Sequence, residues 1–502
     1  MKFLSRLLLL NAAMYFSGML CPLVAQERIN AVIPGDFADP SIIRKGNQYY
    51  AVGTSSEWAP HLPIYQSNNL KDWKQTGFVF DKPPAWTSGS FWAPEYYFHN
   101  NTYFIYYTAR RKKDKVSYIG VASSRYPDKD FKDHGVIIEY GKEAIDAFVF
   151  KDGKQLYITF KAYGLDKRPI EILASKLSPD GLKLQGELFT LIKDDKRIGL
   201  EGQSIIKKGS YYYLFYSAGN CCGSKCDYNV RFARSKSLQG PYENYSENPA
   251  LQENGDWKCS GHGTMVTDPN GKNYYLYHAY NKISTVFTGR QGMLAELQWP
   301  KKNSWPVFQI TPSKNKGQDV IDSFNTKAIA NHWQWYFRNS TPVTKQRQGK
   351  FHLTGTFNPD NKTGIVLAVR PVALNFEATA FVINHNNSLK GLAYYGDANA
   401  ATGIGCINDS IVLWVVKDNK RTELSSASIT PAPVELKIKL MPDLACKFFY
   451  RQDNDNWKEL GTDQKVTADF LPQWDRSPRI GLHFKGGSGG EAVFSSFQLS
   501  YL

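Results

Sequence analysis

Short apolar and aromatic runs alternate with polar turns through the first part of the chain, in a unit that recurs five times. Each unit opens on a polar residue and continues with an apolar run, a turn that holds Gly or Asn, and an aromatic-rich run. Alternating β-branched and aromatic residues between turn residues are typical of strands and hairpins. Successive opening residues are 56, 51, 55 and 61 positions apart, and they are Asp39, Glu95, Asp146, Glu201 and His262.

A repeat of this length with several strands per unit is typical of a β-propeller. We therefore predict an all-β chain whose residues 26–309 form five blades, with the five opening residues around one axis. An unrelated β-sandwich is the alternative, and the shared internal order of the five units argues against it.

The pattern changes after Phe308. Residues 310–321 are polar and contain Pro and Gly, which is typical of a linker. Over residues 322–502 the five-unit repeat is absent, and short alternating strands such as Ser410–Val416 and Val434–Leu440 follow one another. Such strands predict a second domain, a β-sandwich. Because carboxylates are not clustered there, we expect a structural or glycan-contacting role for it.

The first residues have the pattern of an export signal. A basic start at Met1–Arg6 precedes an apolar stretch that ends in small residues near Ala25, and this order predicts a signal peptide over residues 1–25. The protein is then secreted or periplasmic. Cys21 suggests a lipoprotein as the alternative, although Gly18–Cys21 is a poor lipidation box. No later segment is long and apolar enough to predict a membrane span.

The formal net charge of +15 invites a nucleic-acid function. However, the basic residues are scattered, and the densest run, Arg110–Lys115, falls in a predicted hairpin loop. No helix-turn-helix, zinc-finger or RNA-binding signature accompanies it. We therefore expect no nucleic-acid partner, and a basic surface would instead favour approach to an acidic polysaccharide.

Four of the seven cysteines cluster in the fourth unit and the approach to the fifth: Cys221, Cys222, Cys226 and Cys259. Their spacing suggests either a metal knuckle or disulfides. An exported chain that has no paired Cys-x-x-Cys and no nearby His-x-x-x-His favours disulfides. The pairing cannot be derived from the sequence.

A ring of carboxylates around an axis suits hydrolysis of a glycosidic bond. One carboxylic acid protonates the leaving oxygen and a second carboxylate acts on the other face of the sugar, roughly 6.5–9.5 Å away if it activates water. A third carboxylate nearby would raise the pKa of the acid by like-charge repulsion.

The motifs at the openings of the units resemble those of glycoside hydrolase family 43, in the same order and spacing across the first domain. They are Ala38–Ser41, Trp92–Glu95, Ile145–Ala147, Glu201–Ser204 and Gly261–Gly263. This resemblance implies a five-bladed propeller enzyme that inverts stereochemistry. It implies Asp39 as the general base, Glu201 as the general acid, and Asp146 as the carboxylate that orients the acid and tunes its pKa.

The resemblance also implies roles around this trio. His262 matches a histidine near the axis that is commonly linked through water to a calcium ion, and Arg290 matches an arginine that often contacts substrate. No cofactor is required for the chemistry. Trp92 is either a core residue or an aromatic wall for a sugar ring, and Glu95 is expected to be structural. The C-terminal region is similar to the concanavalin-like sandwich, or jelly roll, appended to many members.

A second motif, Asp268–Gly271, reads like the nucleophile motif of retaining invertase-like relatives. Here it falls between two strands of the fifth unit, where Asp-Pro-Asn-Gly is ordinary turn chemistry. We therefore predict a hairpin turn at this position and not a retaining fructan hydrolase.

The resemblance narrows the substrate to plant cell-wall polysaccharides that carry pentoses, such as arabinan, arabinoxylan or pectic side chains. We favour an exo-acting α-L-arabinofuranosidase, with a β-D-xylosidase second and an endo-arabinanase third. A non-catalytic glycan-binding protein is the alternative of another class, and the presence of all three acidic positions argues against it.

Overall fold

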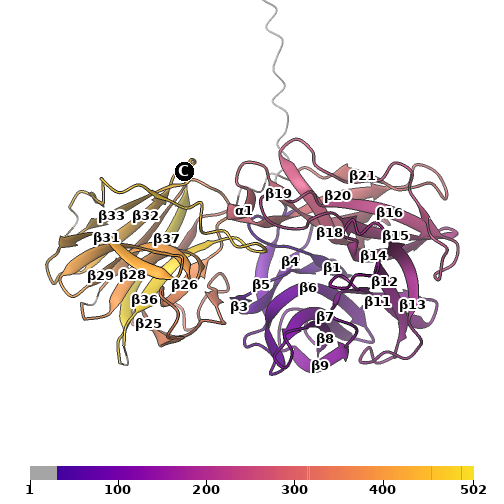
Figure 1. The fold of residues 1–502 in the computed structure, drawn as a ribbon, viewed down its shortest axis with the longest axis horizontal. Helices are drawn as coiled ribbons and strands as arrows, with labels where there is room; N and C mark the ends of the chain where they lie inside the picture. The colour runs from indigo at the N-terminus through magenta and orange to yellow at the C-terminus, as the bar shows by residue number, and fades with distance from the viewer. Residues whose placement is uncertain (1–30, 314, 316, 384, 454, 488) are drawn as a thin grey trace, which may run out of the picture.

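The computed structural model describes residues 31–502 except 314, 316, 384, 454 and 488. The signal peptide predicted for residues 1–25 therefore lies outside the described residues. Strands make up nearly all of the regular structure, which divides into two lobes that follow one another along the chain (Figure 1).

The N-terminal lobe consists of five antiparallel sheets of four strands each, which confirms the predicted propeller. Each sheet uses consecutive strands, except that β3 (Trp58–Ala59) lies outside the first one. The blades are β1 (Ser41–Lys45), β2 (Gln48–Val52), β4 (His61–Ser67) and β5 (Lys74–Phe80); β6 (Thr87–His99), β7 (Thr102–Arg111), β8 (Ser117–Ser124) and β9 (Lys132–Ile138); β10 (Ala144–Asp152), β11 (Gln155–Ala162), β12 (Ile170–Leu177) and β13 (Phe189–Asp194); β14 (Glu201–Lys208), β15 (Tyr211–Ala218), β16 (Asn229–Ser235) and β17 (Glu243–Asn244); and β18 (Trp257–Thr267), β19 (Asn273–Asn281), β20 (Arg290–Gln298) and β21 (Val307–Ile310).

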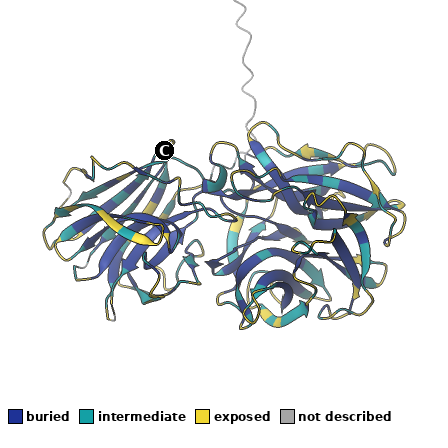
Figure 2. Ribbon diagram, in the orientation of Figure 1, coloured by how far each residue is buried: buried dark blue, intermediate teal, exposed yellow. Residues whose placement is uncertain are grey.

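The first strands of the five blades surround the axis. The last blade meets the first because β18 packs against β1, where the Ile42 N–H donates to Thr264 Oγ1 at 3.0 Å. Aromatic residues fill the space between blades. Phe215 of the fourth blade, for example, packs against Tyr275 and Phe308 of the fifth. The inner strands are therefore mostly buried (Figure 2), and their polar openers lie on a rigid frame.

The C-terminal lobe is a sandwich of two antiparallel sheets, as predicted. Along β27 the buried residues alternate with half-buried ones, which is the period of a strand with one face on the core. One sheet contains β22 (Val320–Asp322), β24 (Ser340–Arg347), β25 (Lys350–Phe357), β27 (Phe376–Val382), β32 (Val434–Leu440), β33 (Ala445–Arg451), β34 (Lys458–Leu460), β35 (Val466–Thr467) and β37 (Ala492–Tyr501); the other contains β26 (Ile365–Val369), β28 (Leu389–Asp397), β29 (Ala400–Ile407), β30 (Ser410–Lys417), β31 (Lys420–Ser428) and β36 (Arg479–Lys485).

The two lobes are joined by backbone pairing and by buried charge. β3 of the propeller pairs with β23 (Trp335–Tyr336) of the C-terminal part, and the Arg479 guanidinium lies 4.2 Å from the ring centre of Trp58. Between β21 and β22 the described residues form no strand, and the predicted linker, residues 310–321, covers this segment and overlaps the ends of both strands. A four-residue helix, α1 (Thr285–Thr288), precedes β20.

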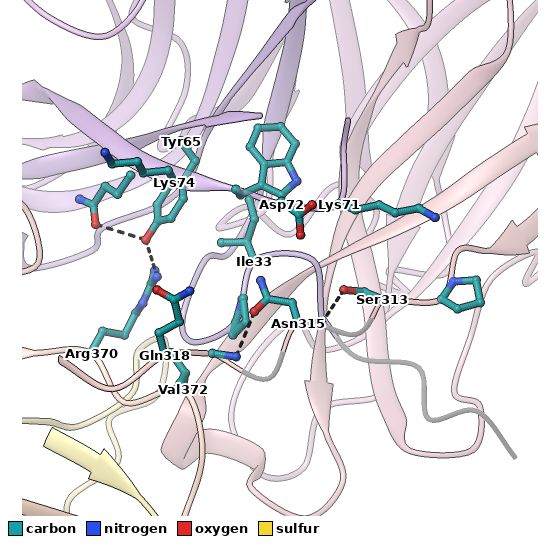
Figure 3. A pocket seen from close by; sticks show the side chains of 15 residues that line it. Ile33, Tyr65, Lys71, Asp72, Lys74, Ser313, Asn315, Gln318, Arg370 and Val372 are labelled. Carbon is teal, nitrogen blue, oxygen red and sulfur yellow. Dashed lines mark hydrogen bonds between the residues drawn. The ribbon is translucent and has the colours of Figure 1, made fainter. Parts of the chain in front are cut away.

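A cavity of about 990 Å³ lies at the seam between the first blade, the connecting segment and the sandwich. Arg370 reaches across it and donates to the Tyr65 hydroxyl (Figure 3). None of the five unit-opening residues lines this cavity. Among the described residues, no helix has the length and apolar character needed to cross a membrane.

Candidate active site

A second cavity, of about 500 Å³, gathers the residues that the sequence singles out. It also receives side chains for which the sequence predicted no place in a site, from the third and fourth blades and from the sandwich, among them Glu143, Lys161, Cys221, Cys222, Trp474 and Asp475. The predicted residues that line it are Asp39, Trp92, Asp146, Glu201, His262 and Arg290.

Irregular backbone turns the opening residues toward this cavity. The pairing of β10 with β11 shifts register between Ile145 and Phe148, and that of β18 with β19 shifts between Lys258 and Gly261 and again across His262. Asp39, Asp146 and His262 have φ values of 50°, 58° and 37°. Bulges re-aim a side chain out of strand alternation, and positive φ in a non-glycine residue persists only where its surroundings hold it. The fold therefore fixes the direction of these side chains.

Asp39 is held as a carboxylate. Arg290 Nη1 lies 3.1 Å from Oδ1, and Thr54 donates to Oδ2 at 2.7 Å. Burial alone would raise the pKa of Asp39, but Arg290 together with His278 and His262 outweighs burial and holds the pKa well below the usual range. The Asp39 N–H donates to Nδ1 of His278, so this nitrogen carries no proton. Burial lowers the pKa of His278 to about 4, which agrees with a neutral ring.

Asp146 is a buried carboxyl with fewer partners. The Gly202 N–H donates to Oδ2 at 3.0 Å, and Nδ1 of His262 lies 3.8 Å from the same oxygen. Burial raises the pKa of Asp146 to about 7; His262 opposes this rise, and the nearby Glu201 carboxylate adds to it.

Glu201 accepts a strong donor at each oxygen. Lys161 Nζ lies 2.6 Å from Oε2, and the Tyr228 hydroxyl donates to Oε1 at 2.9 Å. Burial alone would raise the pKa of Glu201, but the Lys161 ammonium, with smaller contributions from Tyr228 and His262, outweighs burial and holds the pKa below its usual value. Lys161 could have been found from the sequence as the one charged residue in the run Ile158–Ala162, whereas Tyr228 carried no such signal.

His262 lies between the two aspartates, with Nδ1 3.6 Å from Asp39 Oδ1. The backbone N–H of His262 donates to Ser217 Oγ at 2.8 Å. Calcium takes six to eight oxygen ligands, and no group of three or more His, Cys, Asp or Glu side chains in the described part of the chain could hold a metal. The residues present therefore do not fit a directly ligated calcium ion, and the water-mediated ion expected at His262 stays a prediction.

The sandwich contributes to the wall of the cavity through the loop before β36. Trp92 Nε1 donates to Asp475 Oδ2 at 3.0 Å, and Arg290 Nη2 donates to the Asp475 carbonyl at 3.2 Å. Asp475 is buried, whereas its neighbour Trp474 is 63% exposed at the cavity. Both residues expected to contact substrate are therefore tied to the second domain. No sequence signal pointed to this loop, because its position depends on how the domains pack.

The clustered cysteines form two disulfides, Cys221–Cys222 and Cys226–Cys259, which confirms the choice of disulfides over a metal knuckle. The first lies in the cavity wall. The second ties the loop that carries Tyr228 to β18, and this loop thereby positions a donor to Glu201.

Glu95 and Asp268, for which the sequence predicted no catalytic role, do not line the cavity. Ser41 Oγ donates to Glu95 Oε2 at 2.6 Å and the Val149 N–H donates to Oε1 at 3.3 Å, and Glu95 lines a different cavity. Burial raises its pKa to about 8. Asp268 accepts from the N–H groups of Asn270 and Lys272, as expected of a residue in the turn between β18 and β19.

Two family profiles match the chain. The profile described as glycosyl hydrolases family 43 covers residues 29–306, and the one described as the β-xylosidase C-terminal concanavalin A-like domain covers residues 321–483. They correspond to the two lobes.

The chain is similar to proteins of three named activities. It is 28% identical to extracellular endo-alpha-(1->5)-L-arabinanase 1 of Bacillus subtilis, over 54% of this chain and 87% of that protein. It is 25% identical to the non-reducing end alpha-L-arabinofuranosidase BoGH43B of Bacteroides ovatus, over 79% and 78%. It is 26% identical to a beta-xylosidase of Bacillus subtilis, over 88% and 93%.

Solved structures share the whole architecture. The xylan beta-1,4-xylosidase of Bacillus halodurans superposes with a TM-score of 0.82 at 19% identity, over 94% of this chain and 99% of that one. At this identity the likeness concerns the fold alone.

Proposed function

The chain belongs to glycoside hydrolase family 43, and from that membership we propose that it releases terminal pentose units from plant cell-wall polysaccharide with inversion, as an exo-acting α-L-arabinofuranosidase. One observation carries the proposal. A single cavity brings together the three predicted carboxyl groups, Asp39, Asp146 and Glu201, in three different environments, and a loop of the second domain closes part of its wall.

Asp39 is proposed as the general base. Its low pKa keeps it ionised, and Arg290 and Thr54 fix its orientation. In the proposed step a water molecule attacks the anomeric carbon, Asp39 takes the proton of that water, and the bond to the leaving oxygen breaks. Attack from the face opposite the leaving group inverts the anomeric configuration.

Glu201 is proposed as the general acid that protonates the leaving oxygen, with Asp146 as its partner. The two carboxyls influence each other: burial raises the pKa of Asp146 to about 7, whereas Lys161 helps to hold the pKa of Glu201 below its usual value, so Asp146 binds a proton more readily than Glu201. Interacting carboxyls share protons as a pair. Asp146 is thus proposed to orient Glu201 and to tune its pKa. Glu201 becomes the acid when a change in the neighbouring charges raises its pKa enough for it to bind a proton.

The exo mode is supported by the loop that contains Trp474 and Asp475. A side wall supplied by the second domain favours a chain end over a continuous chain. Two relatives that align over most of the chain are named a non-reducing end arabinofuranosidase and a β-xylosidase, and the first of these names describes action at a chain end. The endo-arabinanase aligns with only 54% of the chain, which makes that activity the third candidate.

The β-D-xylosidase stands as the second candidate because that relative aligns with 88% of the chain. Export is proposed as well, since two relatives are named extracellular. Carbohydrate is the proposed partner in every case.

Rates on an aryl α-L-arabinofuranoside, an aryl β-D-xyloside and linear arabinan test the substrate. We expect the arabinofuranoside to be cleaved fastest, with release of the inverted anomer visible by NMR at early times. Asp39→Asn and Glu201→Gln should each lower kcat by about 10²-fold or more on sugar leaving groups, the scale of general acid–base catalysis, while the fold persists.

Two results would contradict the proposal. A retained anomer would rule out water activation by Asp39. Binding of arabinan or xylan by the wild type without any released sugar would favour the glycan-binding alternative.

A further inference from the structure

A buried lysine lies between the proposed acid, Glu201, and a second carboxylate, Glu143. Lys161 belongs to β11, and its side chain is only 11% exposed. Its Nζ lies 2.6 Å from Glu201 Oε2 and 3.9 Å from Glu143 Oε2. An ammonium removed from water requires compensating charge. Because Lys161 has two acceptors within reach, a small displacement of Nζ exchanges one partner for the other.

The acid cannot act while this arrangement persists. Both oxygens of Glu201 accept hydrogen bonds, from Lys161 and from Tyr228. The ammonium at one oxygen and the hydroxyl donor at the other hold Glu201 ionised, whereas a general acid must carry a proton and aim it at the leaving oxygen. One donor must therefore withdraw before Glu201 can be protonated.

Of the two donors, Lys161 is the one that has a second acceptor nearby. Tyr228 is fully buried, stacks on His278, and follows the Cys226–Cys259 disulfide. Lys161 has an unbranched, flexible stem, and its second acceptor Glu143 lies in the same cavity.

Local packing provides the room for the second partner. A Cβ at residue 164 would collide with Glu143 Oε2 and with Cε of Lys161, so Gly164 leaves the space that the pair occupies. Burial raises the pKa of Glu143, and Lys161 opposes the rise.

We propose that Lys161 is a positioning residue that exchanges between Glu201 and Glu143, and that this exchange frees Glu201 to serve as the acid. The inference rests on the proposed function and identifies its control element. When Lys161 moves to Glu143, Glu201 takes a proton from solvent and later gives it to the leaving oxygen. Asp39 takes one proton from the attacking water and returns it to solvent, so no other reactant is needed.

The charged groups around Glu201 come from all five blades, and they determine whether a substitution raises or lowers the pKa of Glu201. Lys161 lowers its pKa, so removal of this ammonium should raise the pKa, and removal of Glu143 should leave Lys161 bound to Glu201. The titratable and charged groups that surround this pair are Asp39, Arg110, Glu143, Asp146, Tyr228 and His262.

Two variants probe the two partners separately. Lys161→Met should shift the high-pH limb of kcat/KM upward by about one pH unit, because the pKa of the acid rises. Glu143→Gln should lower kcat about tenfold on an arabino-oligosaccharide, a modest part of an acid's contribution. It should change the rate on a dinitrophenyl pentoside less than about twofold, because that leaving group needs no protonation.

A direct titration separates this proposal from the proposed function. ¹³C NMR of labelled glutamate carboxyls, with Glu201 assigned through Glu201→Gln, should give a higher pKa in Lys161→Met than in the wild type even if no sugar is released. Lys193→Met, which removes a lysine paired with Glu171 at 3.6 Å on the same blade, should change neither readout. An unchanged Glu201 titration in Lys161→Met, or equal rate losses on both leaving groups in Glu143→Gln, would overturn the exchange.

Discussion

At the scale of single residues, carboxyl groups at equivalent places around the propeller axis differ in pKa because their neighbours differ. Asp39 and Glu95 both open a repeat unit, yet Asp39 faces an arginine, whereas Glu95 is buried against Ser41 and a backbone N–H. The pKa of Asp39 lies far below its usual value and that of Glu95 rises to about 8. Position in the repeat therefore identifies the residues that reach the axis, and the neighbours decide their protonation.

Glu95 should lower the stability of the protein as pH rises. Its pKa in the folded state, about 8, exceeds its ordinary value of 4.5, so the folded protein holds a proton that the unfolded chain has lost between these values. At pH 7 this costs roughly 3 kcal/mol. Glu95→Gln should remove the penalty, raising the thermal unfolding temperature relative to the wild type at pH 8 but much less at pH 5. Parallel stability curves for the two proteins would contradict the burial argument, and unchanged glycoside hydrolysis is the expected control.

At the scale of elements, the sequence predicted what the repeat determines. The blades, and the arrival of Asp39, Asp146 and Glu201 in one cavity, follow from strand periodicity and from equivalent places in each unit. Lys161 enters the same cavity from β11, the second strand of its blade. The residues that open the units belong to the first strands and do not point to it. Asp475 is a residue of a different domain, and its contact with Trp92 depends on packing that no local pattern encodes.

The loop between β15 and β16 should matter for the rate of the reaction as well as for the stability of the fold. Cys226–Cys259 closes 33 residues, and such a closure stabilises a fold by roughly 3 to 4 kcal/mol in the loop-entropy model. Cys226→Ser with Cys259→Ser should free the segment that carries Tyr228. We expect kcat to fall about tenfold or more with a smaller change in KM, because a donor that orients Glu201 is lost.

Circular dichroism should show that the sheets persist in that double variant, since each blade keeps its own strand pairing. Cys221→Ser with Cys222→Ser is the matched comparison, because it removes the adjacent disulfide but leaves the tie to β18. If both double variants lose kcat equally, the specific role of the tie is wrong.

At the scale of the whole molecule, the sandwich completes a site whose chemistry lies in the propeller. Its loop accepts hydrogen bonds from Trp92 and Arg290 through Asp475 and leaves Trp474 exposed beside the cavity. In the proposed reaction this exposed indole would offer an apolar face to the sugar that leaves. The proposed function therefore predicts that the second domain affects how substrates of different length bind.

Trp474→Ala should raise KM for arabino-oligosaccharides about tenfold, since an aromatic contact of this kind is worth about 1 to 1.5 kcal/mol. The KM for a methyl pentoside, which lacks the second sugar, should change less than about twofold, and kcat should change little on either substrate. Trp457→Ala is the control, because this tryptophan packs with Lys437 and Arg451 on the sandwich and does not line the cavity. Equal KM changes on both substrates would mean that Trp474 supports the fold of the loop, because only contact with the departing sugar distinguishes the two substrates.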